Sequence, residues 1–310
     1  MERSLILMEE CYAENLYLYY IYNIYMVEQP FKKKYAVCIW GQLRAIPTIL
    51  ESLNKNIIEH LDADLYVHAQ TTNTKIDEHF HLFNTEHKII YEPSNVTKTF
   101  VHYDQIDKKT KGNNYINVSY LNVYENWFKI SQLWGDEWEQ KYEYIILTRS
   151  DYLYLFPFPD IASLYDKNDL FWCYGGHEYG GVNNTLIVVP SQYVKKYLTC
   201  AYDFLQDSAN IDFLNRSFLN TERFYKLLFN KNDWKIGKMQ MNALITASGK
   251  NEITTWIGIK YSDKYNVFFK YAEQLNDAFA GLNQYQNNEK WTFIKDQDKI
   301  MLMPPNISNN

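Results

Sequence analysis

Short apolar runs alternate with segments of helical periodicity along the first half of the chain. The run at residues 35–40 is apolar on both faces, which is typical of a strand buried inside a parallel sheet. Residues 46–58 carry apolar side chains at helical spacing, and residues 64–68 again form a strand-like run. Together these segments predict a β-α-β unit, which builds a parallel sheet by a right-handed crossover.

The alternation continues along the rest of the chain. Further strands are predicted at 88–91, 144–147, 170–174 and 185–189, and further helices at 118–134, 192–205 and 221–229. Polar segments at 71–84 and 97–117 are predicted as loops, and short strands and helices mix after residue 240. This pattern predicts an α/β protein with a mostly parallel sheet flanked by helices and a more mixed second half.

Domain boundaries follow from the ends of these patterned segments. Residues 1–30 precede the first clear strand and are interpreted as an N-terminal extension. Residues 31–300 are predicted to form a single domain, and residues 301–310 a polar tail. A length of 310 residues fits this organisation, because domains average about 100–200 residues.

Composition narrows the function classes. A hydrophobic content of 46% supports a real core, and a net charge of −6 argues against a nucleic-acid partner. Four widely spaced cysteines predict neither a zinc ribbon nor a disulfide framework and favour a reducing, cytoplasmic location. No run approaches the roughly 20 apolar residues of a membrane-spanning helix, so no transmembrane segment is expected.

The first candidate site follows the strand at 35–40. Gly41 and Gln42 begin the turn, and Arg44 follows them. Ligands of open α/β sheets bind beyond the carboxyl ends of the strands, where a glycine lets the backbone approach and an arginine can grip a phosphate. His68 ends the next strand and is expected to line the same pocket. The alternative is an ordinary turn with a solvated arginine, but arginine occurs at just five positions, which favours a function.

A second candidate follows the strand at 144–147. Arg149, Ser150 and Asp151 stand at its carboxyl end, where a carboxylate can hold Mg²⁺ or Mn²⁺ together with diphosphate oxygens. The alternative is a polar turn with Asp151 as a capping residue. Asp62 and Asp64 spell a D-x-D pattern, but they precede a strand and are expected at the wrong edge of the sheet.

Two further segments carry candidate chemistry. Four of the eleven glycines fall between 175 and 181, around His177 and Glu178, which predicts either a flexible loop over a pocket or a hairpin-like connector. Glu222 lies at the start of a helix, where the helix dipole favours a carboxylate. The same position also suits a general base for a hydroxyl group, so both interpretations stay open.

The order of these motifs resembles a group of GT-A-type glycosyltransferases. The segments GQLR, LDADLYVH, YEYIILTRSDYLY, a glycine-rich stretch with an apolar strand, and TERFYKLL carry the likeness over about residues 34–235. Members occur in surface-polysaccharide and lipopolysaccharide loci of bacteria, and similar chains occur in large DNA viruses. The resemblance implies a Rossmann-like domain, a nucleotide-diphosphate (NDP) sugar donor, a glycan acceptor and a divalent metal, Mn²⁺ or Mg²⁺.

The resemblance also implies roles for individual residues. Asp151 matches the aspartate of a reduced DxD motif and would bind the metal, while Arg149 and Ser150 replace the expected first acidic residue. Glu222 resembles the base of inverting enzymes, with Asp169 and Glu178 as alternatives. No histidine follows His177, which also favours inversion. The donor site would comprise Gly41, Gln42, Arg44, His68, Arg149 and Ser150.

These roles divide the expected domain into a nucleotide-binding half, 31–155, and an acceptor half, 156–300. In the acceptor half, Trp172, Tyr174, Tyr179 and Trp234 are expected to stack on sugar faces, and Trp172, His177 and Tyr179 to bind the acceptor. The resulting prediction is a cytoplasmic hexosyl- or pentosyltransferase of viral or bacterial polysaccharide biosynthesis. One alternative is a non-catalytic protein that binds carbohydrate or nucleotide-sugar on the same fold. Another is a nucleotidyltransferase, which would normally carry a pair of carboxylates and a Gly-Ser turn.

Overall fold

The computed structural model describes residues 32–43, 46–70, 79–110, 114–176, 178–214, 220–249, 260–265, 267–288, 290–296 and 299–304. Apart from Lys32, these residues belong to one compact unit, Lys33–Asn310. The predicted N-terminal extension at 1–30 lies outside the described residues, and so do Arg44 and His177.

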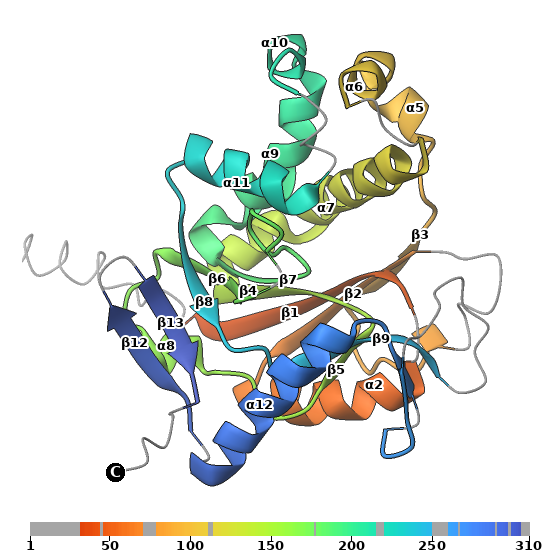
Figure 1. Ribbon diagram of the computed structural model, residues 1–310. Helices are drawn as coiled ribbons and strands as arrows, with labels where there is room; N and C mark the ends of the chain where they lie inside the picture. Colours follow the sequence, from red (N-terminus) through yellow and green to blue (C-terminus); the bar gives the residue numbers. More distant parts are fainter. Residues whose placement is uncertain are drawn as a thin grey trace, which may run out of the picture. The chain divides into compact units, whose positions relative to one another are not determined.

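A nine-stranded sheet forms the centre of the described chain, in the order β12-β13-β8-β6-β7-β4-β1-β2-β3 (Figure 1). Two strands, β7 and β12, run antiparallel to their neighbours, and the other pairs are parallel. This is the mostly parallel sheet of the predicted α/β class. The strands are β1 (Lys33–Gln42), β2 (Asp64–Gln70), β3 (Lys88–Tyr91), β4 (Tyr142–Arg149), β6 (Leu170–Tyr174), β7 (Leu186–Pro190), β8 (Lys235–Met239), β12 (Thr292–Asp296) and β13 (Lys299–Met303).

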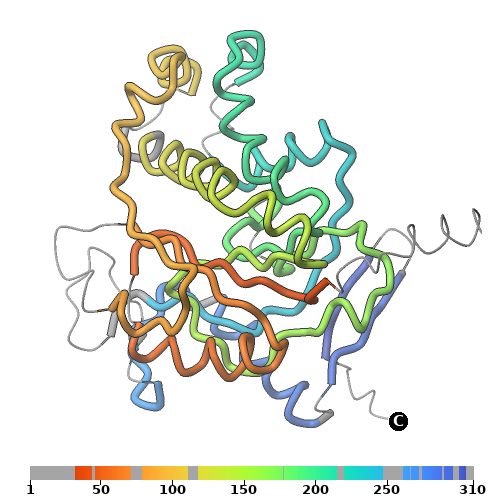
Figure 2. Tube along the Cα trace, turned by 180° about the vertical axis from the view of Figure 1, so that it is seen from behind, coloured from red at the N-terminus to blue at the C-terminus, as the bar shows by residue number. Residues whose placement is uncertain are grey.

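Helices cover both faces of this sheet. In Figure 1 the long helix α7 lies with α9 and α11 over one face, and α2 and α12 lie over the other; Figure 2 shows the same two layers from behind. The longer helices are α2 (Ile46–Leu53), α6 (Tyr103–Thr110), α7 (Asn114–Lys141), α9 (Val194–Gln206), α11 (Thr221–Lys231) and α12 (Ala272–Asn288). The short ones are the π-helical η1 (Asn54–Ile58), α3 (Glu59–Leu61), α5 (Val96–Thr99), α8 (Ile161–Leu164), the 3-10 helix η2 (Ser191–Tyr193) and α10 (Ser208–Ile211). No helix in these described ranges is long and apolar enough to cross a membrane.

A smaller four-stranded sheet contains β10 (Lys260–Ser262), β11 (Val267–Phe269), β9 (Ala243–Gly249) and β5 (Tyr152–Tyr154). The chain passes from β4 of the large sheet to β5 of the small one through Ser150 and Asp151. Because β5 pairs with β9 from Tyr152 onward, these two residues are fixed at the junction of the sheets.

The sheet has an apolar core on each face, which explains why the sequence of β1 is apolar on both faces. Ala36 and Cys38 belong to the apolar cluster under α7 and α9, whereas Val37 and Ile39 belong to the cluster on the α2 and α12 face. Large aromatic side chains fill both clusters, and each buried one contributes about 1.5–3 kcal/mol. Fully buried examples are Trp127, Trp138, Trp172, Tyr66, Tyr144, Tyr174, Tyr197 and Tyr225.

The structure differs from the sequence prediction in the segment 97–117, which was expected to be a loop. It contains α5, α6 and the start of α7. The Asn95 side chain caps α5 by accepting from the Thr97 backbone N–H at 3.1 Å. In α6 just two residues, Ile106 and Thr110, are buried, so its pattern is almost entirely polar. A helix with so narrow a buried stripe gives too weak a periodic signal to be recognised.

The predicted boundary at residue 300 is also wrong in part. Residues 301–303 belong to β13, which pairs with β12 and β8. The Leu302 side chain is fully buried. The last strand of the large sheet therefore includes the beginning of the segment that was predicted to be a polar tail.

Candidate functional site

The carboxyl ends of β1 and β4 lie side by side, because Trp40 pairs with Arg149 in the parallel register of these strands. The Ser150 hydroxyl donates a hydrogen bond to the Gln42 backbone carbonyl, which ties the two strand ends together. Gly41 has a φ of +94°, a conformation that side-chain-bearing residues rarely adopt, and its Cβ position would meet no atom within 4 Å. The carboxyl end of β1 therefore offers open backbone at Gly41.

Arg149 and Asp151 form a two-pronged ion pair at this edge. The Arg149 Nε donates to Asp151 Oδ1 at 2.7 Å, and Nη2 donates to Oδ2 at 2.6 Å. The Asp151 side chain is 4% exposed, and the Arg149 side chain is 24% exposed. Burial alone would lower the pKa of Arg149, but the Asp151 carboxylate outweighs burial, and the net pKa is raised. The guanidinium is therefore held charged at the carboxyl ends of β1 and β4.

The backbone of Asp151 is fixed as firmly as its side chain. Its carbonyl accepts from the Thr246 backbone N–H at 2.8 Å and from the Thr246 hydroxyl at 3.0 Å. Thr246 belongs to β9 of the smaller sheet. The ion pair is thus anchored by both sheets.

The donor set around Asp151 does not fit a divalent metal. Mg²⁺ and Mn²⁺ prefer several oxygen ligands, but both oxygens of this carboxylate are hydrogen-bonded to Arg149. Within the described ranges no group of three or more His, Cys, Asp or Glu side chains could hold a metal ion. The D-x-D pattern offers no alternative, because Asp64 is the first residue of β2, at the opposite end of the strands, and pairs with Lys33.

The glycine-rich segment after β6 packs directly on the start of α11. A Cβ on Gly181 would lie 1.9 Å from the Glu222 backbone carbonyl, so nothing larger than glycine fits. The Val182 N–H donates to the Glu222 carbonyl at 2.8 Å, and Arg223 Nε donates to the Tyr179 carbonyl at 3.2 Å. This contact brings the loop and Glu222 together.

Replacing Gly181 by alanine is expected to destabilise the protein by about 1–3 kcal/mol, because the backbone of Glu222 must move. Gly175→Ala is the matched control, since its Cβ would meet its nearest atoms at 3.6 and 3.8 Å, which is ordinary contact. Urea denaturation of both variants measures the difference. Equal stability of the two variants would show that the loop does not pack on α11.

Glu222 occupies the first turn of α11 without being its cap. The Asn220 side chain caps the helix by accepting from the Arg223 N–H at 2.9 Å, which leaves Glu222 available for another role. Burial raises the pKa of Glu222, while a hydrogen bond from the Thr221 hydroxyl at 3.2 Å partly opposes this. A carboxylate with a raised pKa in a half-buried position is a suitable proton acceptor.

Tyr271 connects Glu222 electrostatically with the ion pair. Burial raises the pKa of Tyr271, the Arg149 cation lowers it, and the charges of Tyr179, Asp151 and Glu222 raise it further. All these groups therefore lie within range of one half-buried tyrosine just before α12. No sequence pattern indicated Tyr271, because it stands in the mixed segment after residue 240.

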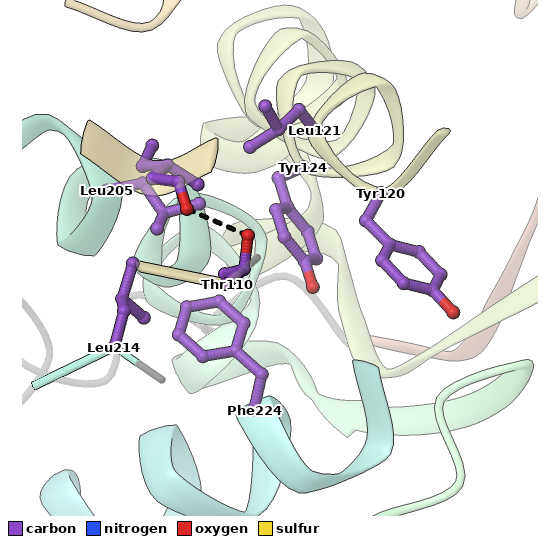
Figure 3. Close-up of a pocket in the computed structure, with 8 residues that line it drawn as sticks. Thr110, Tyr120, Leu121, Tyr124, Leu205, Leu214 and Phe224 are labelled. Atoms are coloured by element: carbon purple, nitrogen blue, oxygen red, sulfur yellow. Dashed lines mark hydrogen bonds between the residues drawn. The ribbon is translucent and has the colours of Figure 1, made fainter. Parts of the chain in front are cut away.

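A small apolar cavity lies between α7 and the start of α11. It has a volume of about 30 Å³, and Figure 3 shows Tyr120, Leu121 and Tyr124 of α7 lining it opposite Phe224 of α11. The ring centroids of Tyr124 and Phe224 are 5.5 Å apart. Burial raises the pKa of Tyr120, and the Glu222 carboxylate raises it further, so Tyr120 lies within electrostatic range of the candidate base.

His68 does not line an open pocket. It is buried between β2 and α7, where its Nδ1 is 2.5 Å from Asn126 Oδ1 and its ring stacks on Tyr91. Burial lowers the pKa of His68 to about 4, so the ring is neutral at physiological pH. The structure therefore places it behind the sheet edge, in a supporting position, and not on the predicted donor surface.

Two other predicted residues lie away from this edge. Asp169 stands just before β6 and accepts from the Tyr165 hydroxyl at 2.7 Å. β7 lies between β4 and β6 and is antiparallel to both, so β6 runs parallel to β4. Asp169 therefore lies at the amino ends of these strands, opposite the carboxyl ends that form the candidate site. Trp172 is fully buried against Gly237, so neither face of its ring is open to a sugar.

The remaining predicted residues lie on the loop that contacts α11. Glu178 forms an ion pair with Lys238 at 3.2 Å, which ties the loop to β8. Tyr179 is 53% exposed and has a positive φ of 47°. Of the four aromatic residues predicted to stack on sugars, Trp172 and Tyr174 are fully buried, Trp234 is partly buried and Tyr179 is exposed.

No protein-family model matches the chain, and no curated protein matches it. Solved structures with partial likeness include mouse xyloside xylosyltransferase 1, at 13% identity over 76% of this chain and 93% of that chain, with a TM-score of 0.41. A glycosyltransferase involved in glycosylation of the major capsid of PBCV-1 matches at 9% identity over 66% and 80%, with a TM-score of 0.36. The glycosyltransferase GlyE of Streptococcus pneumoniae TIGR4 matches at 10% identity over 66% and 45%, with a TM-score of 0.35. These solved structures that the chain resembles are glycosyltransferases.

Proposed function

We propose that this protein transfers a sugar from a nucleotide-sugar donor to a hydroxyl group of a glycan or other acceptor. One observation carries the proposal: segments far apart in the sequence converge at one edge of the sheet. The Arg149–Asp151 pair stands beside Gly41, and Tyr271 lies within electrostatic range of both this pair and Glu222. The motif order in the sequence supplies the reaction class.

On this proposal the donor diphosphate lies against the ends of β1 and β4. Open backbone at Gly41 admits the phosphates, and the charged Arg149 guanidinium attracts them. Gln42 and Ser150 hold the two strand ends in place through their mutual hydrogen bond. Arg44, outside the described residues, belongs to the same proposed donor site.

Glu222 is the proposed base. The acceptor oxygen bonds to the anomeric carbon, the bond from that carbon to the diphosphate breaks, and the acceptor proton passes to Glu222. A single displacement of this kind inverts the anomeric configuration. The raised pKa of Glu222 supports its role, because burial makes the carboxylate a stronger base. The exposed Tyr179 and the neighbouring His177 are proposed to bind the acceptor.

The division of the domain, the type of transferase and its location are also part of the proposal. Residues 31–155 would hold the nucleotide and residues 156–300 the acceptor of a hexosyl- or pentosyltransferase in viral or bacterial polysaccharide biosynthesis. A reducing, cytoplasmic location is supported by Cys38, Cys173 and Cys200, which are free thiols. The sequence resemblance implies a divalent metal, but the described ligands do not fit one, so no step is assigned to it.

Thermal denaturation with a panel of UDP-, GDP- and dTDP-sugars tests the proposal. A donor present at 100 times its Kd adds about 2.7 kcal/mol of stability, which raises Tm by several degrees. We expect at least one nucleotide class to give this shift. A panel without any shift would contradict the proposed donor site.

A non-catalytic sugar- or nucleotide-sugar-binding protein is the second candidate. The observation that favours it is the engagement of Asp151 by Arg149 where the resemblance implies a metal ligand. Hydrolysis of the stabilising donor, measured with and without Mn²⁺, separates the two candidates. Binding without turnover in either buffer would favour the second.

A further inference from the structure

We infer that Arg149, oriented by Asp151, supplies the positive charge for the diphosphate at this site, so that nucleotide binding and sugar transfer need no divalent cation. The inference rests on the proposed function and deepens it. It names the group that takes the place of the metal that the sequence resemblance implies.

The geometry of the Arg149–Asp151 pair is the first observation that supports this role. The two hydrogen bonds to Asp151 use Nε and Nη2, and a guanidinium carries five N–H donors in one plane. The remaining N–H donors of Arg149 belong to the same planar group, and the two hydrogen bonds to Asp151 fix its orientation. Such a fork matches phosphate oxygens without further ordering of the side chain.

The distribution of burial points the charge outward. The carboxylate of Asp151 is almost wholly buried, while Arg149 keeps about a quarter of its side chain exposed. The carboxylate is thus enclosed by the protein, and part of the mostly buried Arg149 side chain reaches the surface. An anion that approaches the carboxyl ends of β1 and β4 meets the Arg149 side chain before the carboxylate.

Asp151 is therefore a positioning residue for Arg149. Its two oxygens bind the guanidinium, and its backbone carbonyl is held by Thr246 of the second sheet. A metal ion at Asp151 would have to compete with the guanidinium for the carboxylate oxygens and would repel its charge; full exchange would remove the guanidinium from its partner. That exchange would leave a buried cation without its partner, which is strongly unfavourable.

The test is calorimetric titration of UDP, GDP and dTDP, first in EDTA and then in Mn²⁺. We expect the Kd of the nucleotide that binds to change by less than about threefold between these buffers. Arg149→Lys, which keeps the charge but loses the fork, is expected to weaken binding by about 10- to 100-fold in EDTA. Mn²⁺ binding to the free protein, followed by electron paramagnetic resonance, is expected to stay at background.

A second variant separates binding from folding. Arg149→Met with Asp151→Leu removes both charges, so no buried charge is left without a partner. This double variant is expected to fold, by circular dichroism, and to bind the nucleotide at least 10-fold more weakly than the unmodified protein. Unchanged binding by the folded double variant would overturn the inference.

The failures of the inference and of the proposed function are distinguishable. Binding that becomes more than about tenfold tighter in Mn²⁺ would overturn the inference and leave the proposed function intact. The absence of nucleotide binding in both buffers would overturn the proposed function, and the inference with it.

Discussion

Replacing Glu222 by glutamine is expected to lower the rate of sugar transfer by about 10²- to 10⁴-fold while the fold is retained. Glutamine keeps the size and polarity of the side chain but cannot accept the acceptor proton. The Asn220 cap and the backbone contacts of α11 do not involve the Glu222 carboxylate. Steady-state transfer kinetics with the donor found in the thermal panel measure the loss, and kcat is expected to fall more than KM rises.

The raised pKa of Glu222 also determines the direction in which the transfer rate and the stability change with pH. Burial raises the pKa of Glu222, so the rate is expected to fall as pH decreases through that raised value. A raised folded-state pKa contributes stability that is fully present below the unfolded-state pKa and is lost as pH rises through the folded-state pKa. Glu222→Gln is therefore expected to have a Tm equal to or above that of the unmodified protein at pH 7, with a smaller difference at pH 4.

Glu51→Gln is the matched control for Glu222, because Glu51 is an exposed carboxylate on α2 at the other face of the sheet. It is expected to change neither kcat nor Tm. A Glu222→Gln variant with unchanged kcat would remove Glu222 from the mechanism.

Replacing Asp151 by asparagine is the second large effect. We expect nucleotide binding to be lost and the free energy of unfolding to fall by about 3 kcal/mol, because a mostly buried guanidinium loses its counter-charge. The value lies at the low end of the range for such pairs, since Arg149 is 24% exposed and water can partly compensate. Urea denaturation and nucleotide titration measure the two losses.

Asp212→Asn is the control for this change. Asp212 pairs with Lys109 at 2.9 Å, but its side chain is 81% exposed, and such surface pairs contribute about 0–1 kcal/mol. The control is expected to bind nucleotide normally and to unfold at nearly the same urea concentration as the unmodified protein. Similar stability losses in both variants would show that the Arg149–Asp151 pair is no more stabilising than a surface contact.

Elements with strong patterns were predictable from the sequence. The strand predicted at 170–174 has the observed bounds, and the one predicted at 35–40 lies inside β1, because both are buried on two faces and read as continuous apolar runs. The short helices α5 and α6 were not predicted, since polar capping and a narrow buried stripe leave little periodicity. The domain boundary predicted at residue 300 falls inside β13, because Pro304, Pro305 and the polar residues after them dominate the pattern there.

The site was predictable where position along a strand determines position in space. Gly41 lies at the carboxyl end of β1, and Ser150 and Asp151 follow the parallel β4, so their meeting follows from the fold class. Trp172 shows the limit, because an aromatic residue in a strand has the same sequence signature whether it faces a core or a ligand. The Arg149–Asp151 pair could not be foreseen either, since the direction of both side chains depends on the turn into β5.

A crystal structure of the protein with the nucleoside diphosphate that binds it tests the central claim most directly. The proposed site predicts the diphosphate oxygens within hydrogen-bonding distance, about 2.7–3.2 Å, of the Arg149 guanidinium and beside the Gly41 backbone. It also predicts that the Arg149–Asp151 contact persists in the complex. A nucleotide bound away from the carboxyl ends of β1 and β4, for example at the opposite edge beside Asp64, would contradict it.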